Sequence, residues 1–171
     1  MKTILYMAMT VNGYIAKEND ETGFVSDIEW NNFQKIAKDI GNMIVGSRTY
    51  KIMVEKEEFN KLCNVRVVIV SDNTDIKIIS NNHSIATSPQ DALTTLEKEG
   101  YRSALVAGGA TLNSSFMAKN LINEIYLDVE PIAFGKGIKL FKDNDFEAKL
   151  KLLSTKKLSD DEIQLHYKVQ K

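Results

Sequence analysis

Short apolar runs alternate with segments of helical periodicity along most of the chain. Runs rich in β-branched residues favour strands, and apolar residues spaced three or four apart favour helices. The run RVVIVS is almost continuously apolar, which is typical of a strand that is covered on both faces. We therefore expect strands at 4–9, 42–46, 66–71, 84–86, 103–107 and 123–130, and helices at 26–40, 47–56, 88–99 and 111–120.

Local signals mark the ends of two of these helices. Ser26 and Glu29 have the spacing of a capping box, and Gly41 is suited to end the same helix. Ser88 precedes Pro89, a residue favoured at the first helical position, and Gly100 follows the last turn. These boundaries predict two amphipathic helices that pack on a sheet.

The pattern changes after Gly137. Segments 149–155 (KLKLLST) and 162–169 (EIQLHYKV) alternate apolar and polar residues, which predicts an antiparallel pair, and 12–25 is expected to be a loop. The prediction is a single α/β domain over residues 1–171, with three αβα layers, a mostly parallel central sheet of about eight strands and a C-terminal antiparallel hairpin. The hairpin carries more apolar residues than one covered face requires, which indicates an interface: Leu150, Leu152, Ile163 and Leu165.

Composition narrows the possible functions. The net charge is −1, with 43% hydrophobic and 26% charged residues, so neither a nucleic-acid surface nor a membrane-binding helix is indicated. The single cysteine, Cys63, rules out an internal disulfide framework and fits a reducing, cytoplasmic location. No apolar run is long enough to cross a membrane, and the two histidines have no neighbours that would complete a metal site.

Three loops that follow strands carry side chains suited to a ligand. Ligands of open α/β sheets bind beyond the carboxyl ends of the strands, and helix starts bind anions there. Each loop alone also has a plain explanation, since glycines ease turns and serines cap helices. The chain contains neither a Walker loop nor a G-x-G-x-x-G fingerprint after its first strand. The candidate loop residues are Gly46, Ser47, Arg48 and Thr49; Ser71; and Gly108, Gly109, Ala110 and Thr111.

Five segments, in order, resemble those of one known group of proteins. They are MAMTVNGYIA, MIVGSRTY, VVIVS, ALVAGGATLNSSFM and EIYLDVEPIAFGKGIKLF. Together they resemble the dihydrofolate-reductase-like fold, and more closely the reductase domain of riboflavin biosynthesis and its stand-alone bacterial relatives. The resemblance extends over essentially the whole chain.

The resemblance implies an NADPH-dependent reductase, commonly a homodimer, acting on a small heterocyclic or carbonyl substrate. Ala8 and Ile15 would lie beside the nicotinamide, and Ser71 near the adenine ribose. The segment Gly46–Thr49 would hold the adenosine-side phosphates. The segment from Gly108 through Leu112 would surround the pyrophosphate and the nicotinamide ribose, with a cis peptide between Gly108 and Gly109.

The chain also departs from these relatives. No proline-tryptophan pair follows Gly13-Tyr14-Ile15, so we expect weak reduction of dihydrofolate or none. We expect no deaminase domain, since these residues hold no Cys/His zinc set, and Asp72 stands where a basic residue would favour NADPH over NADH. The substrate therefore stays open, and so do two alternatives: a dihydrofolate reductase, and a nucleotide-binding protein without catalytic activity.

Three side chains are candidates for the substrate side of the site. Asp27 lies where dihydrofolate reductases carry their acidic residue, although an aspartate in a first helical turn also stabilises the helix dipole. Asp128 lies within a strand, where a charge is costly without a partner, and faces either the pocket or the solvent. Trp30 is either a core residue or part of the pocket wall. We name Asp27 and Asp128 as catalytic candidates and Trp30 as a substrate-binding candidate.

Overall fold

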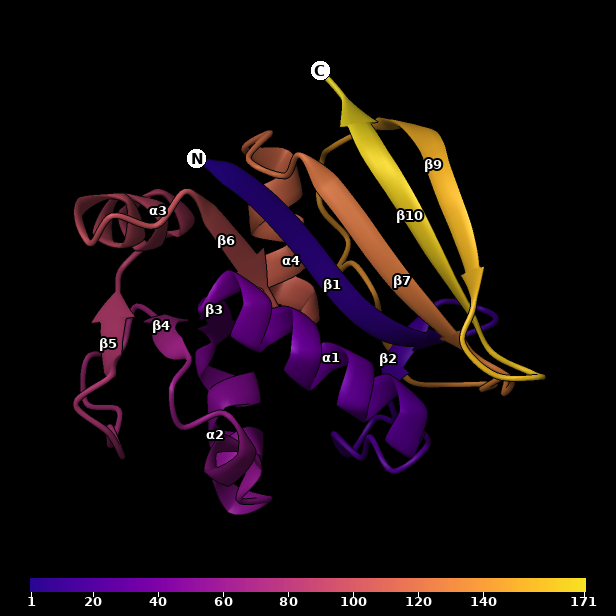
Figure 1. The fold of residues 1–171 in the computed structure, drawn as a ribbon, viewed down its shortest axis with the longest axis horizontal. Coiled ribbons are helices and arrows are strands. Elements are labelled where there is room, and N and C mark those ends of the chain that lie inside the picture. The colour runs from indigo at the N-terminus through magenta and orange to yellow at the C-terminus, as the bar shows by residue number, and fades with distance from the viewer.

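Six parallel strands form most of one central sheet. The computed structural model describes all 171 residues. The sheet has eight strands in the order β5-β4-β3-β6-β1-β7-β10-β9 (Figure 1). Every pair from β5 to β7 is parallel, whereas β10 is antiparallel to both β7 and β9. The predicted fold class, a mostly parallel sheet that ends in an antiparallel hairpin, is confirmed.

The bounds of the elements agree closely with the sequence pattern. The strands are β1 (Lys2–Thr10), β2 (Tyr14–Ala16), β3 (Asn42–Gly46), β4 (Arg66–Val70), β5 (His83–Ala86), β6 (Ser103–Val106), β7 (Glu124–Glu130), β8 (Ile138–Lys139), β9 (Lys149–Lys157) and β10 (Ile163–Gln170). The helices are α1 (Asp27–Ile40), α2 (Ser47–Glu55), α3 (Pro89–Lys98) and α4 (Ala110–Ala118), with one 3₁₀ turn, η1 (Glu58–Lys61).

Alternate residues of each central strand enter two separate cores. On β1, Ile4 and Tyr6 pack in one core with side chains of α1 and α2. Leu5, between them, packs in the other core with side chains of α3 and α4. This alternation follows from the two-residue period of a strand, and it gives the three αβα layers.

Residues 12–25, expected to be a loop, contain a short strand. Tyr14–Ala16 forms β2, which pairs antiparallel with β8 in a separate two-stranded sheet. Each strand is only two or three residues long, and their partners are more than 120 residues apart, so no local run could indicate the pairing. The small sheet fixes the chain that leaves β1.

The C-terminal hairpin leaves apolar side chains on the surface. β9 pairs only with β10, and all nine of its residues are exposed. Leu152 is 50% exposed, and three other large apolar side chains are comparably open: Leu150, Leu153 and Ile163.

Candidate active site

A large cavity of about 1040 Å³ lies at the carboxyl edge of the parallel strands. Its wall is built from the ends of β1 and β6, the loop 15–25, α1, α2 and the start of α4. Its volume is at the upper end of the range for small-molecule sites, which leaves room for an extended ligand. The topology explains its position, since open α/β sheets bind ligands at this edge.

Of the helices that begin at this cavity, α2 and α4 have no side-chain cap. Gly46 is the N-cap of α2 and Gly109 is the N-cap of α4, and neither helix has an acidic residue in its first turn. In contrast, α1 and α3 are capped by the side chains of Ser26 and Ser88. The first-turn amides of α2 and α4 are therefore left to a ligand or to water, and their positive dipole ends favour an anion.

Glycines bring the backbones of these two helix starts together. The Gly46 amide donates a 2.8 Å hydrogen bond to the carbonyl of Gly108, and the Gly108–Gly109 peptide is cis. A Cβ at Gly109 would lie 3.1 Å from Thr49 Oγ1, and one at Gly108, where φ is +89°, would lie 3.0 Å from Met7 Sδ. The two turns therefore form one cradle of bare backbone.

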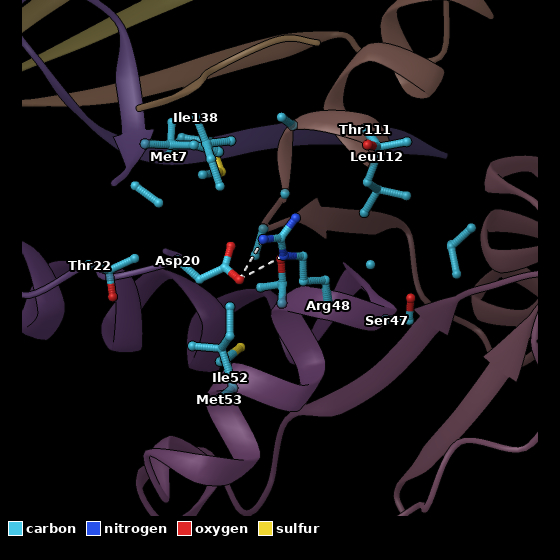
Figure 2. A pocket seen from close by; sticks show the side chains of 18 of the residues that line it. Met7, Asp20, Thr22, Ser47, Arg48, Ile52, Met53, Thr111, Leu112 and Ile138 are labelled. Atoms are coloured by element: carbon cyan, nitrogen blue, oxygen red, sulfur yellow. Dashed lines mark hydrogen bonds and ion pairs between the residues drawn. The ribbon is translucent and has the colours of Figure 1, made fainter. Parts of the chain in front are cut away.

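Arg48 already has an anionic partner in this structure. Its guanidinium lies 2.7 Å from Asp20 Oδ2, and Figure 2 shows the pair between Met7 and Ile138 on one side and Ile52 and Met53 on the other. The loop that carries Asp20 also contacts the end of α2, because the Lys56 ammonium donates a 2.6 Å hydrogen bond to Thr22 Oγ1. A phosphate that reached Arg48 would compete with Asp20.

The structure brings most of the predicted site residues to the cavity. Trp30 lines the wall with its ring stacked on that of Phe33 at a centroid distance of 5.5 Å. Ser71 lies at the end of β4, beside Asp72. The predicted residues that line the cavity are Ala8, Ile15, Asp27, Trp30, Gly46, Ser47, Arg48, Thr49, Ser71, Gly109, Ala110, Thr111 and Leu112. Gly108 is not among the residues that line the cavity, but its carbonyl accepts the hydrogen bond from the Gly46 amide.

The two acidic candidates are not brought together. Asp27 is exposed on the cavity wall. Asp128 is only 1% exposed and lies outside the cavity lining. The sequence had led us to expect that it faces either the pocket or the solvent, and it faces neither. Its carboxylate accepts hydrogen bonds from Tyr6, Asn32 and Gln164, which are the partners that a buried strand carboxylate requires.

Sequence reasoning missed Glu29, which lines the cavity and is only 4% exposed. The Ser26 hydroxyl accepts the Glu29 amide at 3.1 Å, as a capping box predicts. The return bond is absent, because the Ser26 amide donates to Glu130 Oε1 at 2.9 Å. Glu130 takes over the capping role, so the Glu29 carboxyl is free to face the site.

Acidic side chains accumulate behind this wall. Burial, followed by the carboxyls of Asp128 and Glu130, raises the pKa of Glu29 to about 8. Burial also raises the pKa of Asp128, although its hydrogen bonds from Tyr6, Gln164 and Asn32 oppose the rise. Burial raises the pKa of Glu130 as well. The shift at Glu29 indicates that its carboxyl keeps a proton at a pH where exposed carboxyls are ionised.

The family follows from a comparison with known sequences. Residues 1–163 match the model of the RibD C-terminal domain, and the chain belongs to that family. The uncharacterized protein YwjB of Bacillus subtilis (strain 168) is 30% identical over 174 residues, which cover 97% of each chain. A second uncharacterized protein of that organism, YyaP, is 23% identical over 176 residues, covering 97% of this chain and 94% of its own.

Solved structures share the fold at lower identity. A pyrimidine reductase-like protein from Corynebacterium diphtheriae has a TM-score of 0.77 at 14% identity, covering 99% of this chain and 92% of its own. A candidate riboflavin biosynthesis protein from Shewanella sp. PV-4 has a TM-score of 0.81 at 18% identity, with full coverage of both chains. The diaminohydroxyphosphoribosylaminopyrimidine deaminase/5-amino-6-(5-phosphoribosylamino)uracil reductase of Thermotoga maritima has a TM-score of 0.75 at 17% identity, and the match spans 56% of that longer chain.

Two further observations concern metal ligands and membrane-spanning helices. No group of three His, Cys, Asp or Glu side chains is arranged to hold a metal ion. None of the helices combines the length and the apolar character needed to span a bilayer.

Proposed function

We propose that the chain is an NADPH-dependent reductase of a small heterocyclic or carbonyl substrate, of the type that reduces 5-amino-6-(5-phosphoribosylamino)uracil. The observation that carries this proposal is the pair of uncapped helix starts, α2 and α4, that meet at one cavity. Uncapped first-turn amides bind phosphate, and two such starts side by side suit a pyrophosphate. Membership of the RibD C-terminal family supports the reductase class.

The residues present fit a dinucleotide. Bare backbone at Gly46 and Gly109 would let the pyrophosphate approach, with Arg48 and Thr49 beside it. Ser71 would lie near the adenine ribose, and Ala8 and Ile15 beside the nicotinamide. When bound, the reduced nicotinamide supplies a hydride; the chain contributes alignment and exclusion of water.

Titration with NADPH and with NADH tests the cofactor. Trp30 is the only tryptophan and lines the cavity, so quenching of its fluorescence reports occupancy directly. We expect both dinucleotides to bind, with NADPH the tighter of the two. The preference for NADPH is what the resemblance implies, and Asp72, also on the wall, opposes it, because a carboxylate near the ribose disfavours an added phosphate. No quenching by either dinucleotide at about 1 mM, the upper end of ordinary KM values, would refute the proposal.

A substrate panel tests the reductase class. It contains 5-amino-6-(5-phosphoribosylamino)uracil, simple carbonyl compounds and dihydrofolate, with NADPH oxidation followed by absorbance. We expect the protein to turn over the aminouracil. We expect its turnover of dihydrofolate to be far below the enzyme median of about 10 s⁻¹. NADPH binding without oxidation by any compound would instead favour a non-catalytic nucleotide-binding protein.

We also propose that the protein forms a homodimer through its C-terminal hairpin. The exposed apolar side chains of β9 and the start of β10 support this, because they leave a large patch unburied in one chain: Leu150, Leu152, Leu153 and Ile163. The mass of the protein in solution, measured by light scattering, tests it.

A further inference from the structure

Helix α4 carries two buried polar side chains. Asn113 is 0% exposed and Ser114 is 2% exposed, whereas the other buried residues of this helix are apolar. Asn113 Nδ2 donates a 2.9 Å hydrogen bond to the Leu140 carbonyl, and Ser114 Oγ donates one of 2.8 Å to the Lys142 carbonyl. Both bonds therefore hold the same segment, residues 134–142, which we call the strap.

Stability alone does not explain the asparagine at position 113. Its Oδ1 atom is enclosed and has no hydrogen-bond partner. A buried polar atom without a partner lowers the stability of the fold, and such atoms are rare in native proteins. The side chain is better explained by the one bond that its amide makes, which joins α4 to the strap.

The strap connects α4 to the chain that leaves β1. The Leu140 amide donates a 2.9 Å hydrogen bond to the Gly13 carbonyl, so the backbone of Leu140 is held by Asn113 through its carbonyl and by Gly13 through its amide. Just before Leu140, β8 pairs with β2. The two segments approach closely, because a Cβ at Gly137 would lie 2.6 Å from the Ala16 carbonyl oxygen.

The start of the strap holds the loop that follows β2. Asn12 Nδ2 donates a 2.7 Å hydrogen bond to the Phe134 carbonyl, and its Oδ1 accepts the Phe134 amide at 3.2 Å. The Phe134 ring packs edge-on against that of Phe24, with 5.1 Å between the centroids. The strap therefore fixes both β2 and the loop beyond it.

These contacts join two parts of the cavity wall. The first turn of α4, from Gly109 to Leu112, forms one part, and Ile15 of β2 and Ile138 of the strap belong to the other. Asn113 follows Leu112 directly in the chain. The helix that would hold the pyrophosphate thus also holds, through the strap, the wall beside which the nicotinamide would lie.

We propose that Asn113 is a positioning residue of the reduction, which fixes the nicotinamide wall relative to the phosphate cradle. The inference rests on the proposed reductase function. Asn113 does not line the cavity, so it acts through Leu140 and the pairing of β8 with β2. Hydride transfer requires the donor and acceptor atoms to be aligned, and a misplacement of about 1 Å can slow such a step ~100-fold.

The test compares Asn113→Ala with Asn42→Ala, a matched control. Asn42 is also 0% exposed, and its Nδ2 donates a 2.7 Å hydrogen bond to the Ser103 carbonyl. It lies at the start of β3, whereas the cavity lies at the other end of that strand. Both variants lose a buried bond from a side chain to a carbonyl, so both should lower the midpoint of thermal unfolding. Only Asn113→Ala should alter the site.

Calorimetric titration compares NADPH with 2′-phospho-ADP-ribose, which has the same phosphates but no nicotinamide. Asn113→Ala should bind 2′-phospho-ADP-ribose as wild type does and should bind NADPH at least ~5-fold more weakly, because only the nicotinamide wall is displaced. Single-turnover hydride transfer from saturating NADPH to 5-amino-6-(5-phosphoribosylamino)uracil should slow at least ~10-fold. Asn42→Ala should match wild type in all three measurements.

Gly137→Ala tests the same connection from the strap. Its added Cβ must displace the Ala16 carbonyl, which moves β2 without changing α4. We expect the same selective loss of NADPH affinity, with 2′-phospho-ADP-ribose bound normally. This variant keeps the test decisive if Asn113→Ala does not fold.

Four outcomes separate the inference from its alternatives. Wild-type affinities for both ligands in Asn113→Ala, whatever Gly137→Ala shows, would overturn the role of Asn113 and leave the reductase proposal standing. Equal weakening of both ligands would make the effect a general loss of structure. The same selective loss in Asn42→Ala would also overturn the inference. Absence of NADPH binding by wild type would instead refute the proposed function itself.

Discussion

The ion pair between Asp20 and Arg48 should weaken cofactor binding. The two side chains lie 2.7 Å apart at the cavity, where Arg48 would meet a phosphate (Figure 2). If a cofactor phosphate binds Arg48, it must first displace Asp20 from the guanidinium. Replacing Asp20 with Asn removes this competition. Asp20 has a φ of +69°, a conformation that asparagine also tolerates, so the change should leave the loop backbone in place.

The expected effect is modest and has a definite limit. The Arg48 side chain is 68% exposed and that of Asp20 is 27% exposed, so the pair belongs with surface ion pairs worth about 0.2–1 kcal/mol. Asp20→Asn should therefore tighten NADPH binding by up to about 5-fold. Arg48→Ala should weaken binding by about 1.5–3 kcal/mol, because it removes a charge-assisted contact to the phosphate.

A double-mutant cycle separates this competition from other roles of Asp20. NADPH affinity is measured by Trp30 fluorescence for wild type, both single variants and the double variant, at low and high salt. In the Arg48→Ala background, Asp20→Asn should have no effect, and in the wild-type background its effect should shrink as salt screens the pair. Weaker binding by Asp20→Asn, or a gain that persists without Arg48, would refute the reasoning.

Three other predictions concern the cradle, the buried acid and the hairpin. Gly109→Ala should cost about 1 kcal/mol in stability, because the added Cβ would lie 3.1 Å from Thr49 Oγ1, which must move slightly. The same change should lower NADPH affinity at least ~10-fold. A variant that melts early but binds NADPH normally would give Gly109 a purely geometric role. Between pH 4.5, the ordinary pKa of a glutamate, and about pH 8, folded Glu29 keeps a proton that the unfolded chain has lost, so the free energy of unfolding falls as pH rises. Glu29→Gln should reduce this fall, measured by denaturant titrations at several pH values. An equal dependence on pH in the variant and the wild type would contradict the raised pKa. Leu152→Lys, at a side chain 50% exposed, should convert the dimer to monomer by light scattering, whereas an unchanged mass would place the interface elsewhere.

The sequence was sufficient for the main elements because their signals are local. The strand at 66–70 is a β-branched run, and the helix start at Ser88-Pro89 is marked by its own residues. The pairing of β2 with β8 could not be predicted, because each strand is too short to show a period. Its stability depends on a partner that is brought near only by the complete fold.

The site was predictable in part, for the same physical reason. The loops GSRT and GGAT are recognisable because they follow strands and start helices. Glu29 was not recognised, because the capping-box pattern explains a glutamate at that position. Its release from this role depends on Glu130, 101 residues further along the chain and on a different element. Asp128 was correctly expected to be costly without partners, but two of its three partners, Tyr6 and Gln164, come from distant strands.

The hydrogen bond between the Gly46 amide and the Gly108 carbonyl fixes the spacing between the two helix starts. It joins the ends of β3 and β6, which are neighbours in the sheet, so the span between α2 and α4 follows from strand geometry, about 4.8 Å between adjacent strands. Side chains at positions 47, 48 and 111 can therefore change during evolution and alter affinity while the span stays constant. In a chain that keeps this sheet, the spacing of β3 and β6 sets the distance between two bound phosphates.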